Sequence, residues 1–429
     1  MLARLETVRR GVASRFTRMG PLASDGVLYG SSAIFAALLA LTSTQAAQWH
    51  WGYLAAGPYA AVGVVALVIS RRARRFSEAG QRRLRLVLLG LVVLGAVAIP
   101  LGLEARWRHL DHGAGFAQPE VSVIERSATY VSHGLDPYRS YIHNGRLVNA
   151  VPGVPAYQSF FPYLPLMSVF GLPSAATHRA ELTDARIIMS LMTLLVAAMA
   201  LAMLRATHER KIRVAQVLLA LPTGALFLAT GGDDMPILAL LLLGVVALQR
   251  HRTWLAGASL GVAAAMKFTA WPVAVGALLV AVDASGRRRW MRVAVVVVAL
   301  VALTSVPFAV RAPAAFIANV VAFPLGIAGV HSPAASPLPG HILTTLWSPL
   351  GHLVEPITMV VLGYLGVAYL RRHWPIDLPT LLRVSSVGAT VVILAASATR
   401  IGYVIYPLNF ALWSWVVTPA EVREPLLVG

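Results

Sequence analysis

Long apolar runs recur from one end of this chain to the other, and they restrict its fold more than any other feature. Of its 429 residues, 57% are hydrophobic and 13% are charged. The runs approach the roughly 20 residues that a helix needs to cross a bilayer. Their side chains do not alternate with a period of two, as the strands of a membrane barrel would. The sequence therefore predicts an all-α polytopic membrane protein.

The apolar runs define about twelve expected membrane-spanning helices. They cover residues 26–44, 53–70, 86–103, 185–204, 214–230, 234–249, 253–267, 270–283, 291–310, 353–370, 379–397 and 402–418. A further apolar stretch, 160–173, is short and interrupted by prolines, which predicts a partly inserted or interfacial helix. We expect residues 1–85 to form a basic arm with a two-helix extension, and residues 86–429 to form the main module.

The positive charge falls on one side of the membrane in this arrangement. With the N-terminus inside, the cytoplasmic segments are 1–25, 71–85, 205–213, 250–252, 283–292, 371–383 and 419–429. They hold 26 of the 36 Lys and Arg residues but 8 of the 18 acidic residues, a difference equal to the formal net charge of +18. This asymmetry indicates a multi-pass plasma-membrane protein with both termini in the cytoplasm. Binding to nucleic acid is not needed to explain the charge.

Two long polar intervals, 104–158 and 311–352, lie on the outer side, whereas most cytoplasmic connections are short and basic. Long loops on a rigid bundle are where binding and catalytic residues gather. The chain has no cysteine, which excludes disulfides and thiol chemistry.

The first outer interval contains "PEVSVIERSATYVSHGLDPY", residues 119–138. Apolar residues with helical spacing are Val121, Ile124, Ala128 and Val131. Glu120, Glu125 and Arg126 lie mainly off that stripe, and Gly134 with Asp136-Pro137 ends the pattern. We expect an interfacial helix on the outer membrane surface with carboxylates at its margin. A surface helix without a catalytic role would show the same periodicity.

Lysine occurs only twice in the chain, at Lys211 and Lys267. Lys267 lies in "LAGASLGVAAAMKFTAWPVAVGALL", a stretch too long for one span, so we expect a helical hairpin that turns at "KFTAWP". This turn brings the ammonium group to the outer face, where an ionisable side chain is a candidate for function. The alternative is that Lys267 extends to lipid headgroups.

Polar residues also begin two late spans. Asp233 and Asp234 open "DDMPILALLLL", where helix capping alone would account for an acid. Arg400 and Tyr403 lie in "SATRIGYVIYPLNFALW", at the outer end of the last hairpin. The topology directs a set of polar residues to one outer face: Glu120, Asp234, Lys267, His341 and Arg400.

These motifs, in this order, resemble the GT-C superfamily of integral-membrane glycosyltransferases. Within it the chain is most similar to the polyprenol-phosphate-mannose-dependent α-mannosyltransferases of the actinobacterial envelope. Glu120 occupies the position of that family's acidic residue, Val123 matches its valine, and Gly134 to Tyr138 closes the motif. "FFPYLPL", "GGDDMPILALLLLGVVAL", "AGASLGVAAAMKFTAWP" and "SPAASPLPGHIL" resemble the later motifs. The resemblance covers about residues 86–420.

The resemblance implies a hexosyltransferase whose donor is a polyprenyl-phosphate sugar, with mannose favoured, and whose acceptor is a glycolipid or glycan. A carboxylate can deprotonate the acceptor hydroxyl, and cationic side chains can stabilise the leaving phosphate without a metal. Candidate bases are Glu120, with Asp111 and Glu125 in reserve. Candidate substrate-binding residues are Lys267, Arg400, Tyr403, His341, Asp234, Asp233, Tyr138 and Arg126. We expect no cofactor, no metal, and inversion at the anomeric carbon.

Two departures from the family pattern bear on this assignment. Glu120 stands where the family has Asp, which leaves the identity of the base open, and Asp234 stands where it has Asn, which leaves the substrate open. His109, Asp111 and His112 are ligand types, but they lie close together beside arginines, which favours a solvated segment over a metal site. Two alternatives remain: a transporter or flippase for a lipid-linked sugar, and an inactive scaffold of the same fold.

Overall fold

The computed structural model describes residues 19–111, 114–177, 181–330 and 333–418. The ends that the sequence assigns to the cytoplasm, 1–18 and 419–429, lie outside the described residues. The chain forms two compact units. The first contains the described residues up to Ala117 together with Thr207–Thr230, and the second contains Gln118–Ala206 and the described residues from Gly231 onward.

The first unit is a bundle of helices. These are α2 (Pro21–Thr42), α3 (Ala46–Ser70), α4 (Glu78–Val93), α5 (Ile99–Asp111), α9 (His208–Ala215) and α10 (Pro222–Thr230). Small residues allow α2 and α3 to pack closely, since a Cβ at Gly52 would lie 2.5 Å from the carbonyl oxygen of Ala36. Such close approach is typical of helices packed within membranes. The Tyr59 hydroxyl donates to the Ala220 carbonyl at 2.5 Å and ties α3 to the turn before α10.

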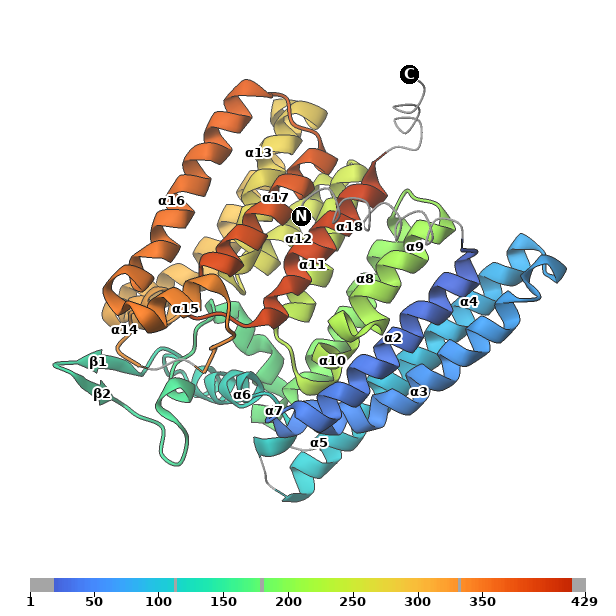
Figure 1. Cartoon of the computed structure of the whole chain (residues 1–429). Coiled ribbons are helices and arrows are strands. Elements are labelled where there is room, and N and C mark those ends of the chain that lie inside the picture. Colours follow the sequence, from blue (N-terminus) through green and yellow to red (C-terminus); the bar gives the residue numbers. More distant parts are fainter. Residues whose placement is uncertain (1–18, 112–113, 178–180, 331–332, 419–429) are drawn as a thin grey trace. The chain divides into compact units, whose positions relative to one another are not determined.

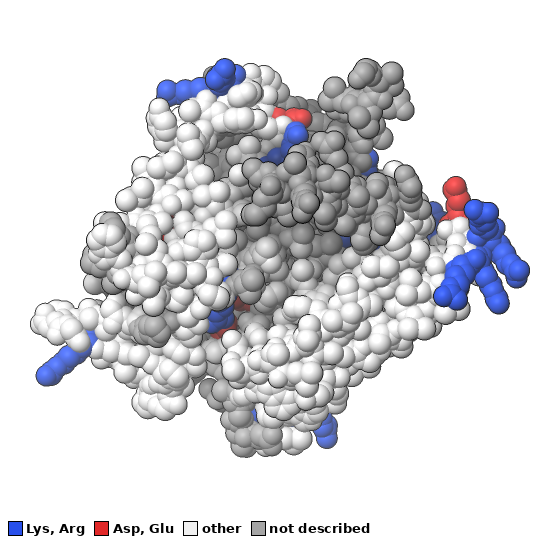
Figure 2. Space-filling view, in the orientation of Figure 1, with Lys and Arg blue, Asp and Glu red and all other residues white. Residues whose placement is uncertain are grey.

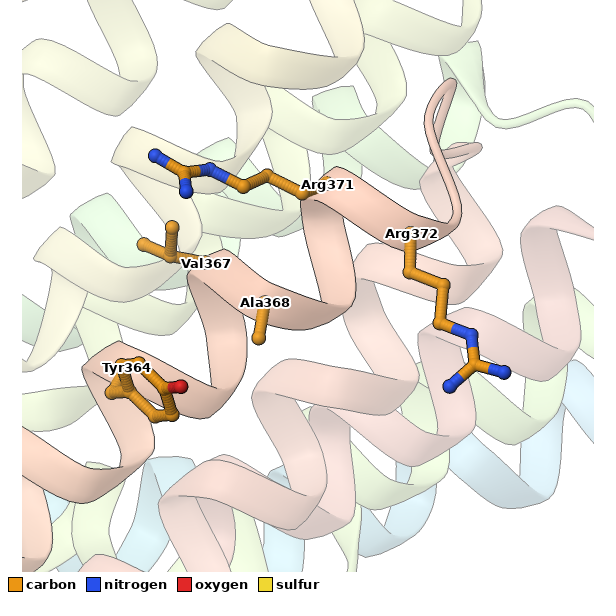
Figure 3. A pocket seen from close by; sticks show the side chains of 5 residues that line it. All are labelled: Tyr364, Val367, Ala368, Arg371 and Arg372. Carbon is orange, nitrogen blue, oxygen red and sulfur yellow. The ribbon is translucent and has the colours of Figure 1, made fainter.

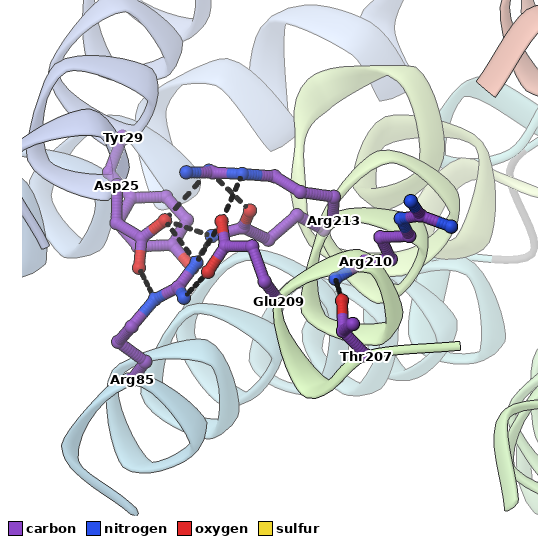
Figure 4. Close-up of polar contacts among 8 residues, drawn as sticks. Asp25, Tyr29, Arg85, Thr207, Glu209, Arg210 and Arg213 are labelled. Atoms are coloured by element: carbon purple, nitrogen blue, oxygen red, sulfur yellow. Dashed lines mark hydrogen bonds and ion pairs between the residues drawn. The ribbon is translucent and has the colours of Figure 1, made fainter. Parts of the chain in front are cut away.

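A buried charge network joins three helices of this unit (Figure 4). Arg85 on α4 donates from Nε to Asp25 on α2 at 2.5 Å and also contacts Glu209 on α9. Arg213 lies 2.8 Å from Asp25 and 3.2 Å from Glu209, and Gln216 donates to Asp25 at 2.9 Å. The sequence placed Asp25 in the basic arm before the first span. It lies instead inside α2 with its side chain 1% exposed, because the arginines neutralise its charge.

Replacing Arg85 by leucine should destabilise the protein by about 3 kcal/mol, the lower end of the cost of breaking a buried ion pair. The lower end applies because Arg213 still contacts Asp25 and Glu209. The unfolding midpoint of the purified protein in detergent measures the effect. Arg83→Leu is the matched control, since Arg83 is exposed on the same helix. Equal midpoints for the two variants would contradict a stabilising role of the network.

The second unit holds most of the chain. Its helices are α6 (Pro119–Ser132), α7 (Leu172–Ala176), α8 (Ala185–Met203), α11 (Asp234–Gln249), α12 (Thr253–Ala264), α13 (Trp271–Arg311), α14 (Pro313–Ile317), α15 (Pro339–Leu346), α16 (Ser348–Arg372), α17 (Leu378–Ala395) and α18 (Ile405–Val417). Helix α11 lies at the centre, with every residue from Asp234 to Ala247 buried, and it packs against α8 and α12. A Cβ at Gly244 would lie 2.6 Å from the Leu260 side chain, so the α11–α12 contact depends on a glycine.

The polar interval 104–158 contains a hairpin that we did not predict. Strands β1 (Tyr141–His143) and β2 (Arg146–Val148) pair antiparallel, with His143 opposite Arg146 (Figure 1). Asn144 and Gly145 connect them, and both have positive φ angles, of 49° and 73°. Asn-Gly is the preferred pair for such a two-residue turn, so the signal was present in the sequence.

Helix α13 contains 41 residues, which would span about 60 Å if it were straight. Its two ends nevertheless lie close together. Phe308 packs 6.4 Å from the Tyr138 ring, the Tyr138 hydroxyl donates to the Tyr163 carbonyl at 2.7 Å, and the Tyr163 ring lies 5.5 Å from Lys267, just before α13. The helix therefore reverses direction between its two apolar segments, the first of which ends at Val280 and the second of which begins at Trp290. This agrees with two expected spans joined by a basic turn.

Seven helical segments of the described residues are long and apolar enough to cross a bilayer, and further apolar helices are shorter. Their outward faces carry many exposed large hydrophobic side chains, which lipid would cover. In Figure 2 most of the visible surface is uncharged, and basic side chains gather beyond the ends of helices α3 and α4. There Arg71, Arg72, Arg74 and Arg75 are all exposed. The chain is an all-α polytopic membrane protein, as the sequence predicted.

Candidate functional site

Helix α6 presents the first acidic residue of the site. Its buried face includes Val121, Ile124 and Ala128, three of the four positions that the periodicity predicted, whereas Val131 is half-buried. Pro119 begins the helix and Glu120 lies in its first turn, where the helix dipole favours a carboxylate.

Glu120 forms an ion pair with Arg400, a residue 280 positions later in the chain. Its Oε1 lies 2.7 Å from Nη1 of Arg400, and the two side chains are 18% and 28% exposed. Burial alone would lower the pKa of the Arg400 guanidinium, but the neighbouring Glu120 carboxylate opposes this effect, and the net pKa is raised. The second oxygen, Oε2, is buried and has no hydrogen-bond partner among the described residues. Arg400 therefore holds one oxygen of Glu120 in place, and the other oxygen can still accept a hydrogen bond.

Lys267 lies at the turn between α12 and α13, as the sequence predicted. Its Nζ lies 2.7 Å from Oδ2 of Asp233 and also contacts Oδ1 of Asp234 at the start of α11. The adjacent Met266 carbonyl accepts a hydrogen bond from the Leu164 amide at 2.9 Å, which attaches the turn to the segment before α7. The Lys267 side chain is 13% exposed, and the two carboxylates offset the cost of burying its ammonium group.

Two tyrosines lie between the ion pairs. Nζ of Lys267 is 5.5 Å from the Tyr163 ring centroid and 5.9 Å from that of Tyr403, within cation–π range. Tyr163 and Tyr403 also interact electrostatically with Arg400. Asp233 lies in the turn before α11, and its pKa is raised to about 6, mainly by burial. Lys267 lowers this pKa, whereas the Asp234 and Glu120 carboxylates raise it. The two ion pairs thus belong to one electrostatic environment.

Tyr406 on α18 donates to Oδ1 of Asp234 at 2.5 Å and lies 2.7 Å from the Thr269 hydroxyl. Neither Tyr406 nor Tyr163 was among the predicted site residues. Both lie in apolar stretches of the sequence. A buried phenol hydroxyl needs a polar partner, so a tyrosine in such a stretch was the available indication of a buried polar site. We call eight residues the polar cluster: Glu120, Tyr163, Asp233, Asp234, Lys267, Arg400, Tyr403 and Tyr406.

Three further predicted residues lie outside the polar cluster, and one of them, Tyr138, contacts a member of it. Tyr138 is buried, and its hydroxyl donates to the Tyr163 carbonyl at 2.7 Å. Arg126 donates to the carbonyl of Gln158. His341 lies on α15, with Nδ1 2.8 Å from the Ser397 carbonyl oxygen.

The two reserve carboxylates lie elsewhere. We predicted Glu125 at the exposed margin of α6, but its position is buried. It is 4% exposed and accepts a hydrogen bond from the Ala185 amide at 3.1 Å. It is buried because it caps the start of α8, which a helical periodicity cannot reveal. Asp111 ends α5 in the first unit, and its side chain lies outside the part that the structure describes.

The described side chains contain no group of three or more acidic or histidine residues placed to hold a metal ion. Within the polar cluster, Lys267 already neutralises Asp233 and Asp234. His112, one of the weak metal candidates from the sequence, lies outside the described residues.

Two shallow cavities lie away from the polar cluster. One, of about 310 Å³, is lined by Tyr364, Val367, Ala368, Arg371 and Arg372, all from α16 (Figure 3). In this view Arg371 and Arg372 extend away from one another, so the residues form an open helix face and do not converge on a ligand. The other, of about 500 Å³, is lined by Arg383, Ser386, Val387, Ala411, Ser414, Trp415 and Thr418. Arginine beside aromatic residues at helix ends is typical of a membrane interface.

The fold and the polar cluster together define a polytopic membrane protein with acidic, cationic and phenolic groups gathered around a buried helix start. Residues 161–397 match glycosyltransferase family 87, which is more than half of the chain. The chain therefore belongs to this family and is a membrane glycosyltransferase. No match was found among curated proteins.

Proposed function

We propose that this glycosyltransferase moves a sugar, with mannose as the first choice, from a polyprenyl-phosphate carrier to a glycan or glycolipid acceptor. The reaction takes place at the outer face of the plasma membrane, with both termini in the cytoplasm. The charge asymmetry of the sequence supports this orientation, because in the expected topology the positive excess lies in the cytoplasmic segments. The catalytic module begins near residue 86, after a two-helix extension.

The observation that carries the proposal is the arrangement of Glu120. Arg400 holds Oε1 at 2.7 Å, while the buried Oε2 has no partner among the described residues. A carboxylate fixed in this way can accept a proton from a hydroxyl within hydrogen-bond reach. Glu120 is therefore assigned as the general base, although the resemblance to related enzymes favoured the shorter Asp at this position.

The acceptor oxygen attacks C1 of the donor sugar while its proton passes to Glu120. The bond between C1 and the phosphate oxygen breaks, and polyprenyl phosphate leaves with the bonding electrons. Attack opposite the leaving group inverts the anomeric carbon. Lys267 and Arg400 stabilise the charge that develops on the phosphate, so the residues present need no metal for this step.

The sugar has polar partners in the same cluster. Asp233 and Asp234 can accept hydrogen bonds from sugar hydroxyls, and Tyr403 lies within reach of Lys267 and Arg400 to orient the donor. Tyr138 supports Tyr163 beneath Lys267. The polyprenyl tail would extend along the apolar residues near 160–173 into the bilayer.

We expect purified protein in lipid nanodiscs to transfer mannose from polyprenyl-phosphate mannose to a synthetic alkyl mannoside, with or without EDTA. GDP-mannose, a soluble nucleotide sugar, should not replace the lipid donor. Mass spectrometry of the product measures transfer, and its NMR coupling constants give the anomeric configuration. Transfer from GDP-mannose alone would refute the lipid donor. Movement of the lipid donor across a vesicle membrane without transfer would identify a flippase.

A further inference from the structure

Arg400 lies on a segment with little regular structure of its own. Helix α17 ends at Ala395, and a short 3-10 turn begins at Ile401, so residues 396–400 connect two helices as an irregular loop. We call residues 396–400 the Arg400 loop. A guanidinium on such a loop reaches Glu120 reproducibly only if other elements hold its backbone.

The segment before α15 provides the first support. The Thr399 amide donates to the Ala334 carbonyl at 2.9 Å, and the Ser336 amide donates back to the Thr399 carbonyl at 3.0 Å. Ala335 and Thr399 thus form an isolated parallel bridge. Thr399 is fully buried, so this bridge fixes the residue directly before Arg400.

Helix α15 provides the second support, through Gly340 and His341. A Cβ at Gly340 would lie 2.1 Å from the Ala395 carbonyl oxygen, so α15 packs directly on the backbone where the Arg400 loop begins. The next residue, His341, places Nδ1 2.8 Å from the Ser397 carbonyl oxygen. A carbonyl oxygen only accepts, so Nδ1 must carry the proton in this contact.

Helix α16 provides the third support. Glu355 is buried, and its Oε2 accepts a hydrogen bond from the Ser397 amide at 3.3 Å. The Ser397 hydroxyl lies 3.5 Å from the same oxygen. His341 and Glu355 therefore hold the two backbone polar groups of one residue, from two different helices.

We infer that His341 and Glu355 are positioning residues that act on the reaction through Arg400, and that the outer interval 311–352 exists in part to hold the Arg400 loop. This differs from a direct substrate contact by His341, which the sequence suggested. The inference rests on the proposed function for its kinetic consequence, because Arg400 is assigned to the donor phosphate there. The contacts that hold the loop do not depend on that assignment.

Amide hydrogen exchange of the full-length protein in nanodiscs tests the structural half without substrate. In His341→Leu the amides of Ser397 and Thr399 should exchange about tenfold faster, because the loop opens more readily. His341→Asn should stay near the wild-type rate, since its side-chain amide nitrogen can occupy the place of Nδ1. His341→Gln places its amide nitrogen nearer the place of Nε2 and should behave like leucine. Unchanged exchange in the leucine variant overturns the inference.

Glu355 offers a matched pair for the same measurement. Glu355→Gln retains an oxygen acceptor for the Ser397 amide and should keep the loop protected, whereas Glu355→Leu should release it. Should the leucine variant fail to fold, the comparison of His341→Asn with His341→Gln remains decisive, because these variants differ in the position of one amide group. Equal exchange at Ser397 in His341→Asn and His341→Gln overturns the role of Nδ1.

Kinetics with polyprenyl-phosphate mannose then test the consequence for Arg400. His341→Leu should raise the donor KM about tenfold and leave the acceptor KM unchanged, the size expected for one lost hydrogen bond. In an Arg400→Lys background, His341→Leu should raise the donor KM less than about twofold, because the effects of substitutions at residues that act through one another are not additive. A full additional effect in that background would mean that His341 contacts the substrate itself, and would overturn the inference.

Discussion

Replacing Glu120 by glutamine is expected to reduce sugar transfer by about 10²–10⁴-fold, the usual contribution of a general base. Glutamine has the same size and keeps an oxygen that can accept the hydrogen bond from Arg400. It cannot take the proton of the acceptor hydroxyl. Because the Glu120 side chain is partly exposed, the unfolding midpoint should change little. Turnover under saturating donor and acceptor measures the effect, and the loss should appear in kcat.

Two further variants sharpen this test. Glu120→Asp keeps a carboxylate but shortens the side chain by one methylene, so we expect activity between those of the glutamine variant and the wild type. Glu78→Gln removes an exposed carboxylate at the start of α4 and should behave as the wild type. Wild-type turnover in Glu120→Gln would remove this residue from the chemistry and leave its contact with Arg400 as its role.

The sequence predicted the helices well because each long apolar run has few stable structures in a bilayer. It also predicted the α12–α13 turn at Lys267, since the apolar stretch was too long for one span. The start of α2 was misplaced because Asp25 looked like a loop residue. Its burial depends on Arg85 and Arg213, which lie 60 and 188 residues further along the chain.

The candidate site was predicted in part. Topology alone directed Glu120, Lys267 and Arg400 to one side, and the structure brings them into one polar cluster. The ion pairs within the cluster could not be predicted, because the sequence does not indicate that Arg400 pairs with Glu120 or that Lys267 pairs with Asp233.

Tyr406 and Thr269 were missed for the opposite reason: their neighbours are apolar, and only the fold shows that the two hydroxyls lie 2.7 Å apart. Glu125 and His341 illustrate a third limit. Their residue types suit catalysis, yet Glu125 accepts a hydrogen bond from the Ala185 amide and His341 contacts the Ser397 carbonyl. Contacts to backbone groups carry no signature in the sequence.

Removal of the Lys267 ammonium should have the second large effect. In Lys267→Met, Asp233 loses a partner at 2.7 Å and Asp234 retains Tyr406, so a buried carboxylate is left without its cation. Breaking a buried pair in this way costs about 3–5 kcal/mol. We therefore expect a lower unfolding midpoint, together with a donor KM that rises at least about tenfold while the acceptor KM changes little.

Loss of folding and loss of phosphate binding must be separated, and the neighbouring acids allow it. The triple variant Lys267→Met, Asp233→Asn, Asp234→Asn removes the buried charges together, which is often neutral for stability. Its unfolding midpoint should return toward the wild type, while binding of polyprenyl phosphate, measured by native mass spectrometry, stays weak because no ammonium is present. If carrier binding recovers along with stability, Lys267 holds the α11 start in place and does not bind the phosphate, which would leave Arg400 as the single cation of the polar cluster for the leaving group.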